Sequence, residues 1–344
     1  MLQLSVIIPA YNAGSSLEKC AHSILRNCDP DLELIIVNDG STDDTEMICG
    51  RLAETDKRVK ILCRENSGVS ASRNAGIEAA AGEYIAFADA DDSLEPGAYG
   101  RMLGALKESG AGCGVCGYYI TTPGGNCKPR CAPFPDGFHD YSEIKEKLVL
   151  SLFADRVSRD LILGAVWRWL FKRSVIIENN IRFSGAYLED EIFLIEYFSY
   201  PATVYSVNEP LYYYLQNPAS VTKKFMPDFI AVFNASLAKK EELAERQISA
   251  LPLYWRDNTL WAGLFIAVSN VFAPGNPKPF REKLKSLNEI CELEYFRGAI
   301  KNYRPDKLSV KKAVVAGLIR KNRLLPLSIL YALKNRNRGK RNDV

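Results

Sequence analysis

Short apolar runs alternate with stretches of helical periodicity through the first hundred residues, and this alternation constrains the fold more than any other feature. Uninterrupted apolar runs are typical of parallel strands that are buried on both faces. Such runs predict strands at 4–10, 32–39, 59–65 and 84–88. Apolar residues at helical spacing predict helices at 15–27 and 67–82. Repeated strand–helix–strand units predict a doubly wound α/β fold with a mostly parallel sheet.

Polar side chains follow three of these predicted strands. Tyr11 and Asn12 come after the first strand, Asp39 after the second, and Asp89 and Asp91 after the fourth. In doubly wound sheets, ligands bind outside the carboxyl ends of the strands. The sequence therefore predicts one site at this edge of the sheet. Beside it, the spacing of serine and aspartate in "GSTDDT" predicts a capping box that starts a helix at Ser41.

The segment "ADADD" places three carboxylates directly after a buried strand, and close like charges repel unless something compensates them. Mg²⁺ or Mn²⁺ commonly joins one or two carboxylates to substrate phosphates, so Asp89 and Asp91 predict a cation and a nucleotide diphosphate. A competing interpretation is that Asp91 and Asp92 cap the helix that starts near Glu95. That interpretation leaves Asp89 unexplained.

The chain of 344 residues is long enough for two domains. We expect a catalytic domain at 1–222, with a nucleotide-binding half at 1–100 and an acceptor half at 101–222. A helical region with a basic tail is expected at 223–344. Within the acceptor half, the segments "VWRWLFKRSVII" and "YLEDEIFLIEYFSY" have the pattern of amphipathic helices.

The net charge of +3 argues against nucleic-acid binding by the whole chain. The N-terminus lacks the basic and apolar regions of a signal peptide, and no apolar run reaches the roughly 18 residues of a membrane span. A cytoplasmic protein is expected. Near the C-terminus, "RKNRLLPLSILYALKNRNRGKR" places an apolar stretch between basic clusters, which is typical of peripheral contact with the inner face of a membrane. The alternative, a helix docked on the catalytic domain with a solvated tail, stays open.

Nine cysteines in a chain without a secretion signal argue against a disulfide framework. The spacing of Cys113, Cys116, Cys127 and Cys131 is compatible with a structural zinc ion. It is equally compatible with free cysteines used as small core residues. The sequence leaves both open.

Five segments in order, "VIIPAYNA", "IIVNDGSTDDT", "NSGVSASRNAGI", "GEYIAFADADD" and "YLEDEIF", resemble the family-two (GT2) glycosyltransferases of bacterial non-processive type. The resemblance implies the Rossmann-like GT-A fold with a C-terminal helical extension. It implies a hexosyltransferase that uses Mn²⁺ or Mg²⁺ and transfers a sugar, with inversion, from a nucleotide-sugar donor, most often UDP-linked. The acceptor would be a glycan or a lipid-linked saccharide in bacterial surface polysaccharide synthesis, such as capsule or O-antigen.

The resemblance also implies roles for individual residues. The nucleotide would be bound by Pro9, Ala10, Tyr11, Asn12, Asp39, Arg73, Asp89 and Ala90. Asp39 would hydrogen-bond the uracil ring, and the "DxD" motif at 89–91 would contact ribose and metal, chiefly through Asp91. For Arg73, a salt bridge on a helix surface is the competing interpretation.

By the same resemblance, Asp190 is the catalytic base, and its neighbour Glu189 binds the acceptor or is the second choice for the base. A helix N-terminus suits a base that must stay ionised. The competing interpretation is an acidic first turn without catalytic function.

Two further segments are expected to shape the acceptor and diphosphate sites. Trp167 and Trp169 offer aromatic surface on which a sugar could stack, unless both are core residues. Ser220 and Thr222 lie in a segment that resembles the family's loop over the diphosphate.

Other functions fit the residues less well. A processive synthase would need membrane spans and a Gln-x-x-Arg-Trp motif, but Ala165 stands where the glutamine would be. A nucleotidyltransferase would need a basic, Gly-rich loop after the first strand, but "PAYNAGSS" has neither Lys nor Arg. A catalytically silent nucleotide-binding module would have no need of acidic residues at 89, 91 and 190.

Overall fold

The protein forms two compact units. The computed structural model describes residues 2–26, 31–122, 124–154, 164–216, 225–246, 251–305 and 308–342, with the backbone alone for 334–342. The N-terminal unit comprises 1–149 and 162–217, and the C-terminal unit comprises 150–161 and 218–344. The sequence prediction divided the chain at 222/223 and placed 150–154 in the catalytic half, whereas these residues belong to the C-terminal unit.

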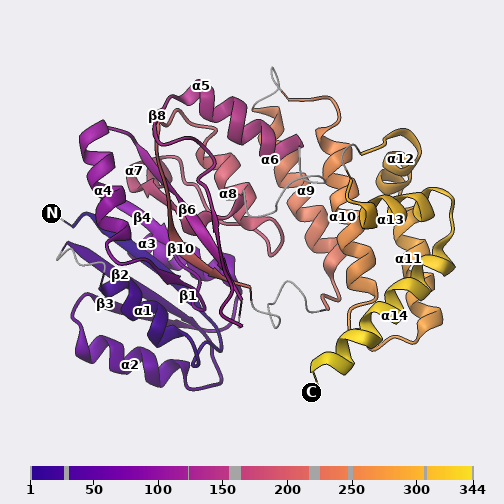
Figure 1. Ribbon diagram of the computed structural model, residues 1–344, viewed down its shortest axis with the longest axis horizontal. Helices are drawn as coiled ribbons and strands as arrows, with labels where there is room; N and C mark the ends of the chain where they lie inside the picture. Colours follow the sequence, from indigo (N-terminus) through magenta and orange to yellow (C-terminus); the bar gives the residue numbers. More distant parts are fainter. Residues whose placement is uncertain are drawn as a thin grey trace. The chain divides into compact units, whose positions relative to one another are not determined.

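One mixed sheet forms the core of the N-terminal unit, and ten strands belong to it in the part of the chain that the structure describes (Figure 1). The strand order is β3-β2-β1-β4-β9-β6-β10-β5, with β7 beside β6 and β8 beside β10. The strands are β1 (Leu4–Ala10), β2 (Leu32–Asp39), β3 (Val59–Arg64), β4 (Tyr84–Phe87), β5 (Ser93–Leu94), β6 (Cys113–Thr121), β7 (Cys127–Arg130), β8 (Gly137–His139), β9 (Trp169–Lys172) and β10 (Val204–Leu215).

The α/β class is confirmed, and β3, β2, β1 and β4 are parallel neighbours, as predicted for the first hundred residues. Farther along the chain, β6 and β10 are also parallel neighbours, but the other pairings differ. β9 runs antiparallel to both of its neighbours, β4 and β6, and β5, β7 and β8 also pair antiparallel. The sheet as a whole is therefore mixed.

Helices and short helical turns connect the strands of the N-terminal unit. The helices are α1 (Leu17–Leu25), α2 (Thr45–Thr55), α3 (Val69–Ala79), α4 (Ala98–Ser109), α5 (Tyr141–Ile144), α7 (Arg173–Glu178) and α8 (Glu189–Tyr197). A π-helical turn covers Lys145–Val149, and a 3₁₀ turn covers Val166–Arg168.

One predicted helix is wrong, because the segment "VWRWLFKRSVII" contains strand β9 between the 3₁₀ turn and α7. Leu170, at the middle of this strand, lies opposite Ala86 on one side and Gly114 on the other. It is fully buried. A place inside the sheet, which only the tertiary fold provides, overrides the helical pattern of the segment.

The C-terminal unit is helical, as predicted. Its helices are α6 (Leu150–Ala154), α9 (Phe229–Glu245), α10 (Trp255–Val271), α11 (Phe280–Glu292), α12 (Glu294–Asn302), α13 (Val310–Arg320) and α14 (Leu324–Asn342). The fully buried Lys240 of α9 donates to the Leu152 carbonyl of α6 at 2.8 Å. Across the described ranges, no helix combines the length and the apolar character needed to cross a bilayer.

The four cysteines considered for zinc do not come together. Cys113 and Cys116 are buried in β6, whereas Cys127 and Cys131 are exposed. Cys127 pairs with Thr121, eight residues along β6 from Cys113, which is roughly 26 Å at the rise of a strand. Among the residues with described side chains, no group of three or more His, Cys, Asp or Glu is arranged to hold a metal ion. Core packing accounts for Cys113 and Cys116.

A buried polar network fixes the start of β4 against β1. The Ser5 hydroxyl donates to Glu33 at 2.5 Å and accepts from the Gly82 N–H at 2.8 Å. The Lys60 ammonium lies 2.6 Å from the second oxygen of Glu33. A Cβ atom on Gly82 would stand 2.6 Å from the Ser5 nitrogen, so only glycine allows this approach.

We expect Gly82→Ala to lower the free energy of unfolding by about 1–3 kcal/mol, because the added methyl meets backbone that cannot move aside. Gly50→Ala is the matched control. It adds a methyl where no atom lies within 4 Å, in the middle of α2, and should raise stability by up to about 1 kcal/mol. Urea denaturation followed by circular dichroism measures both. Overlapping curves for wild type and Gly82→Ala would contradict the packing argument.

Candidate active site

The segment after β1 and the segment after β2 are joined by hydrogen bonds. Asn12 has a positive φ of 50°. Its backbone N–H donates to the Ser41 hydroxyl at 3.0 Å. Its side-chain oxygen accepts from the Thr42 N–H at 2.8 Å. Ser41 therefore does not cap α2, which begins at Thr45, and the predicted capping box is wrong. Just before Asn12, Tyr11 is 52% exposed and presents its ring to solvent.

Asp39 is buried at the end of β2, where it anchors the start of α3. Its two carboxylate oxygens accept from the N–H groups of Ser67 at 3.1 Å and Gly68 at 2.8 Å. Arg64 forms an ion pair with it at 3.5 Å. A carboxylate has about four acceptor positions, so these contacts leave capacity for a further donor.

Asp92 has a structural role that the sequence did not indicate. It is buried and accepts from the Tyr212 hydroxyl and from the Leu215 N–H, both at 2.7 Å. The Tyr212 hydroxyl in turn accepts from the Asp89 N–H at 3.1 Å. Burial, reinforced by the charge of Asp89, raises the pKa of Asp92 well above its usual value. Since α4 begins only at Ala98, Asp92 does not cap it but ties the acidic turn to β10.

Asp89, Ala90 and Asp91 remain half-buried at the carboxyl end of β4. Carboxylate oxygens are the ligands that Mg²⁺ and Mn²⁺ prefer, and one or two of them suffice when substrate phosphates complete the coordination. The two acidic side chains therefore fit a divalent cation that arrives with a nucleotide diphosphate.

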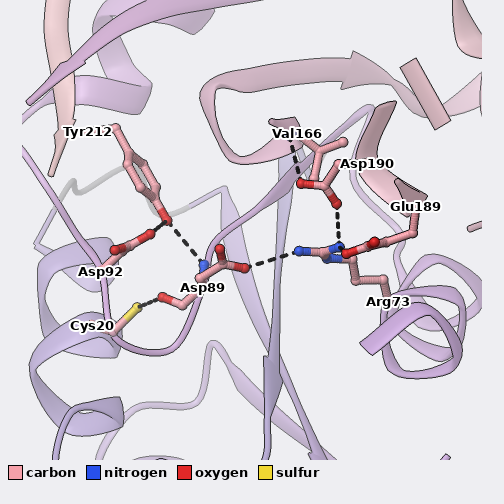
Figure 2. Close-up of polar contacts among 8 residues, drawn as sticks. All are labelled: Cys20, Arg73, Asp89, Asp92, Val166, Glu189, Asp190 and Tyr212. Atoms are coloured by element: carbon pink, nitrogen blue, oxygen red, sulfur yellow. Dashed lines mark hydrogen bonds and ion pairs between the residues drawn. The ribbon is translucent and has the colours of Figure 1, made fainter. Parts of the chain in front are cut away.

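Arg73 of α3 lies at the centre of the site and joins carboxylates from two distant segments. Figure 2 shows its guanidinium between Asp89 on one side and Asp190 and Glu189 on the other. The guanidinium nitrogens lie 3.1 Å from Asp89, 2.5 Å from Asp190 and 3.6 Å from Glu189. Its carbon lies 5.1 Å from the centre of the Phe183 ring.

Arg73 is buried, which by itself would lower its pKa, but the three carboxylates outweigh burial and raise it. It therefore stays charged. The expectation of a salt bridge on an exposed helix face is wrong.

Asp190 lies in the first turn of α8, as predicted, with 23% of its side chain exposed. Burial raises its pKa to about 7 against the opposing effect of Arg73, and the charges of Glu189 and Asp89 add to the rise. Its second oxygen accepts from the Val166 N–H at 3.4 Å. Burial and the neighbouring like charges thus oppose the helix N-terminus, which favours the ionised form.

The loop that leads into α8 is held by α3. The Asn74 side chain donates to the Phe183 carbonyl and accepts from the Phe183 N–H, both at 2.9 Å. Leu188, directly before Glu189, has φ of 65°, a conformation that costs a leucine roughly 1–2 kcal/mol. Its buried side chain holds it there. Adjacent residues of α3, Arg73 and Asn74, therefore contact both the carboxylates and the loop that presents them.

Trp167 and Trp169 offer no exposed ring face to a sugar. Trp167 is 4% exposed and stacks on Tyr212 at 4.4 Å between ring centres. Trp169 is 1% exposed and packs against Phe198 at 5.1 Å. The competing interpretation, that both are core residues, describes the structure.

The remaining predicted residues divide into two groups. Pro9 and Ala10 end β1, opposite Val37 and Asn38 of β2. Ser220 and Thr222 lie outside the described residues.

Sequence reasoning missed several contributors. Tyr212, whose hydroxyl accepts from the Asp89 N–H, and Phe183, whose ring lies beside Arg73, belong to no recognised motif. Val166 contributes its backbone N–H, which donates to Asp190. None of these has a signal in a single sequence.

Comparison with known proteins places the chain in a family. Residues 5–155 match the model of glycosyl transferase family 2. The protein EpsH of Bacillus subtilis (strain 168) is 27% identical over 352 aligned positions, which cover 98% of each chain. The chondroitin synthase of Pasteurella multocida is 34% identical over 152 residues, which are 44% of this chain and 15% of that one.

Among solved structures, S. aureus TarS 1-349 in complex with UDP-GlcNAc superposes with a TM-score of 0.60 and 16% identity. The match covers 97% of this chain and 92% of that chain. At this identity the likeness concerns the fold alone. The fold and the family match define a glycosyltransferase of the GT-A type. Over residues 5–155 the chain matches glycosyl transferase family 2, the family that its motifs resemble.

We expect Arg73→Met to lower the free energy of unfolding by roughly 3 kcal/mol, because it leaves the carboxylates of Asp89 and Asp190 together without a cation. Asp190→Asn in the Arg73→Met background should recover part of the loss, with a coupling of about 1 kcal/mol or more in a double-mutant cycle. Denaturant unfolding at pH 8 measures the four proteins of the cycle.

The control is Arg101→Met. It breaks the exposed pair between Arg101 and Glu209, and should cost less than about 1 kcal/mol. Additive effects of the Arg73 and Asp190 substitutions would show that the two side chains do not stabilise each other.

Proposed function

We propose that this protein is an inverting, metal-dependent hexosyltransferase that moves a sugar from a UDP-sugar to a saccharide acceptor. The observation that carries the proposal is the contact of Arg73 with both Asp89, on the donor side, and Asp190, on the acceptor side. Two comparisons support it. TarS was solved with UDP-GlcNAc, and the Pasteurella relative is named chondroitin synthase.

The nucleotide would be bound by the segments after β1 and β2. The half-exposed ring of Tyr11 offers a face for stacking on the uracil, beside Pro9, Ala10 and Asn12. The remaining acceptor capacity of Asp39 suits the ring N–H of uracil. Ala90 has only a methyl side chain and would leave room for the ribose beside Asp89 and Asp91.

Mn²⁺ or Mg²⁺ would be held by Asp91, with Asp89 as the second carboxylate. When bound, the cation offsets the negative charge that develops on the leaving diphosphate. Since Asp89 also contacts Arg73, this carboxylate has to divide its oxygens between the guanidinium and the donor complex.

Asp190 would act as the general base. Its carboxylate takes the proton of the acceptor hydroxyl as the hydroxyl oxygen bonds to the anomeric carbon of the sugar. The bond from that carbon to the diphosphate oxygen breaks on the opposite face, and UDP leaves with the electron pair. A pKa of about 7 suits this role, because a base works best when its pKa is near the working pH. Glu189, 3.6 Å from Arg73, would orient the acceptor.

The acceptor would be a growing glycan or a lipid-linked saccharide in the synthesis of a bacterial surface polysaccharide. To use a lipid-linked acceptor, the enzyme would have to act at the inner face of the membrane, and its basic C-terminal segment would contact the lipids.

Two rival activities are disfavoured. A nucleotidyltransferase would need basic residues after β1, and a silent module would not need a group with the raised pKa of Asp190.

A screen of nucleotide sugars should identify a UDP-sugar whose turnover requires Mn²⁺ or Mg²⁺ and is lost in EDTA. Asp91→Asn should weaken UDP binding at least tenfold in the presence of Mn²⁺, because it removes a charged ligand, and leave the weak binding in EDTA unchanged. Isothermal titration calorimetry measures both. Glu54→Gln, on the exposed face of α2, is the control. Equal loss with and without the cation would argue against a metal role for Asp91.

Asp190→Asn should lower kcat for sugar transfer by about 10²–10⁴-fold, with little change in the KM of the donor. In the wild type, kcat/KM for the acceptor should rise with pH and level off above about pH 7, because the base is active only when deprotonated. Glu189→Gln should keep a profile of the same shape with a smaller loss of rate, but the rise should move to lower pH, because the charge of Glu189 raises the pKa of Asp190. Undiminished turnover by Asp190→Asn would rule out Asp190 as the base.

A further inference from the structure

Helix α14 of the C-terminal unit is apolar on two faces, but only one of them is packed. Leu324 and Leu327 are buried against the unit. On the other side, Leu325, Ile329 and Leu333 recur every fourth residue and are 51%, 46% and 57% exposed. Residues four apart share one face of a helix, so these side chains form a continuous apolar stripe. Such a stripe marks an interaction surface.

Helix α13 of the same unit also leaves apolar side chains in solvent. Val310 and Val314, four residues apart, are 82% and 49% exposed. Both helices therefore carry aliphatic side chains that the described part of the C-terminal unit leaves largely uncovered.

The charge of this region restricts what can cover it. Residues 310–342 contain ten Lys or Arg and no Asp or Glu, although the whole chain has a net charge of only +3. A second copy of the chain would bring two strongly positive segments together, which is unfavourable. An anionic surface complements them. Aliphatic side chains beside Lys and Arg are the composition of helices that lie in the headgroup region of a bilayer.

A pocket of about 210 Å³ lies beside this region, lined by residues of α10, α13 and α14. Its lining is mostly apolar, with Phe265, Ile266 and Val315, and it includes Lys311 and Lys312. An apolar lining beside two lysines suits an amphiphile that has an acyl chain and a negatively charged head. The pocket, like the exposed stripe, therefore favours an anionic amphiphile such as a lipid.

We propose that α13 and α14 dock on an anionic lipid bilayer. The stripe Leu325, Ile329 and Leu333 inserts at the level of the headgroups, and the Lys and Arg residues of 310–342 contact lipid phosphates. The contact involves the C-terminal unit alone and does not depend on the chemistry at Asp190. It would hold the enzyme at the surface where lipid-linked saccharides are found.

Vesicle sedimentation of the full chain tests the proposal. The wild type should bind vesicles of phosphatidylcholine with 30% phosphatidylglycerol at least tenfold more tightly than vesicles of phosphatidylcholine alone, and binding should weaken with salt. The variant L325Q/I329Q/L333Q should lose at least tenfold in affinity. Because these side chains are exposed, its melting temperature should stay that of the wild type. Leu253→Gln, which changes a fully exposed leucine elsewhere in the C-terminal unit, is the matched control and should bind like wild type.

A second variant, K334Q/R336Q/R338Q, tests the charge contribution and should weaken binding by about 100-fold, since each basic residue near an anionic surface contributes about fivefold. Equal binding to both kinds of vesicle would overturn the proposal, and so would undiminished binding of the glutamine stripe variant. Dimerisation in sedimentation velocity that the stripe variant abolishes, without binding to vesicles, would assign the stripe to a second copy instead.

Discussion

The guanidinium of Arg73 neutralises carboxylates from two segments of the chain, and the geometry of the active site depends on it. Asp89 follows a strand at the centre of the sheet. Asp190 lies in the first turn of α8, and 117 residues separate it from Arg73 in the sequence. Without a cation, three acidic groups at this distance would repel one another. Because Arg73 is buried, its charge is poorly screened by water and acts strongly on each of them. One side chain thereby sets the distance between the turn after β4 and the start of α8.

A second set of contacts makes the position of these carboxylates rigid. The hydroxyl of Tyr212 links Asp92 to the backbone of Asp89, and Asn74 pairs with Phe183 through two hydrogen bonds. The acidic turn is thus held from β10, and the loop before α8 is held from α3. Both supports come from regular elements of the N-terminal unit. Preorganised groups of this kind need little rearrangement when substrate binds.

The first hundred residues could be predicted well, because strands that are buried on both faces have a strong local signal. β1, β2, β3 and β4 lie where the apolar runs are, and Asp39 and Asp89 follow them as expected. The acceptor half was harder, since β9 becomes a strand only through its neighbours in the sheet.

The ionisation of Asp190 and the burial of Trp167 depend on distant residues in the same way. A motif singled out Asp190, but only the fold shows that burial raises its pKa against the effect of Arg73. A single sequence does not distinguish an exposed tryptophan from a buried one. It could therefore not decide whether Trp167 and Trp169 stack on a sugar or pack in the core.

The position of β9 between β4 and β6 also affects the order in which the chain can fold during synthesis. β4 pairs with β1 early, but its other edge has no partner until residues 169–172 have left the ribosome. An unpaired edge in the middle of a sheet is open to pairing with another chain. The nascent N-terminal half is exposed to this hazard while roughly 80 further residues are made, which takes about 4–16 s at about 5–20 residues per second.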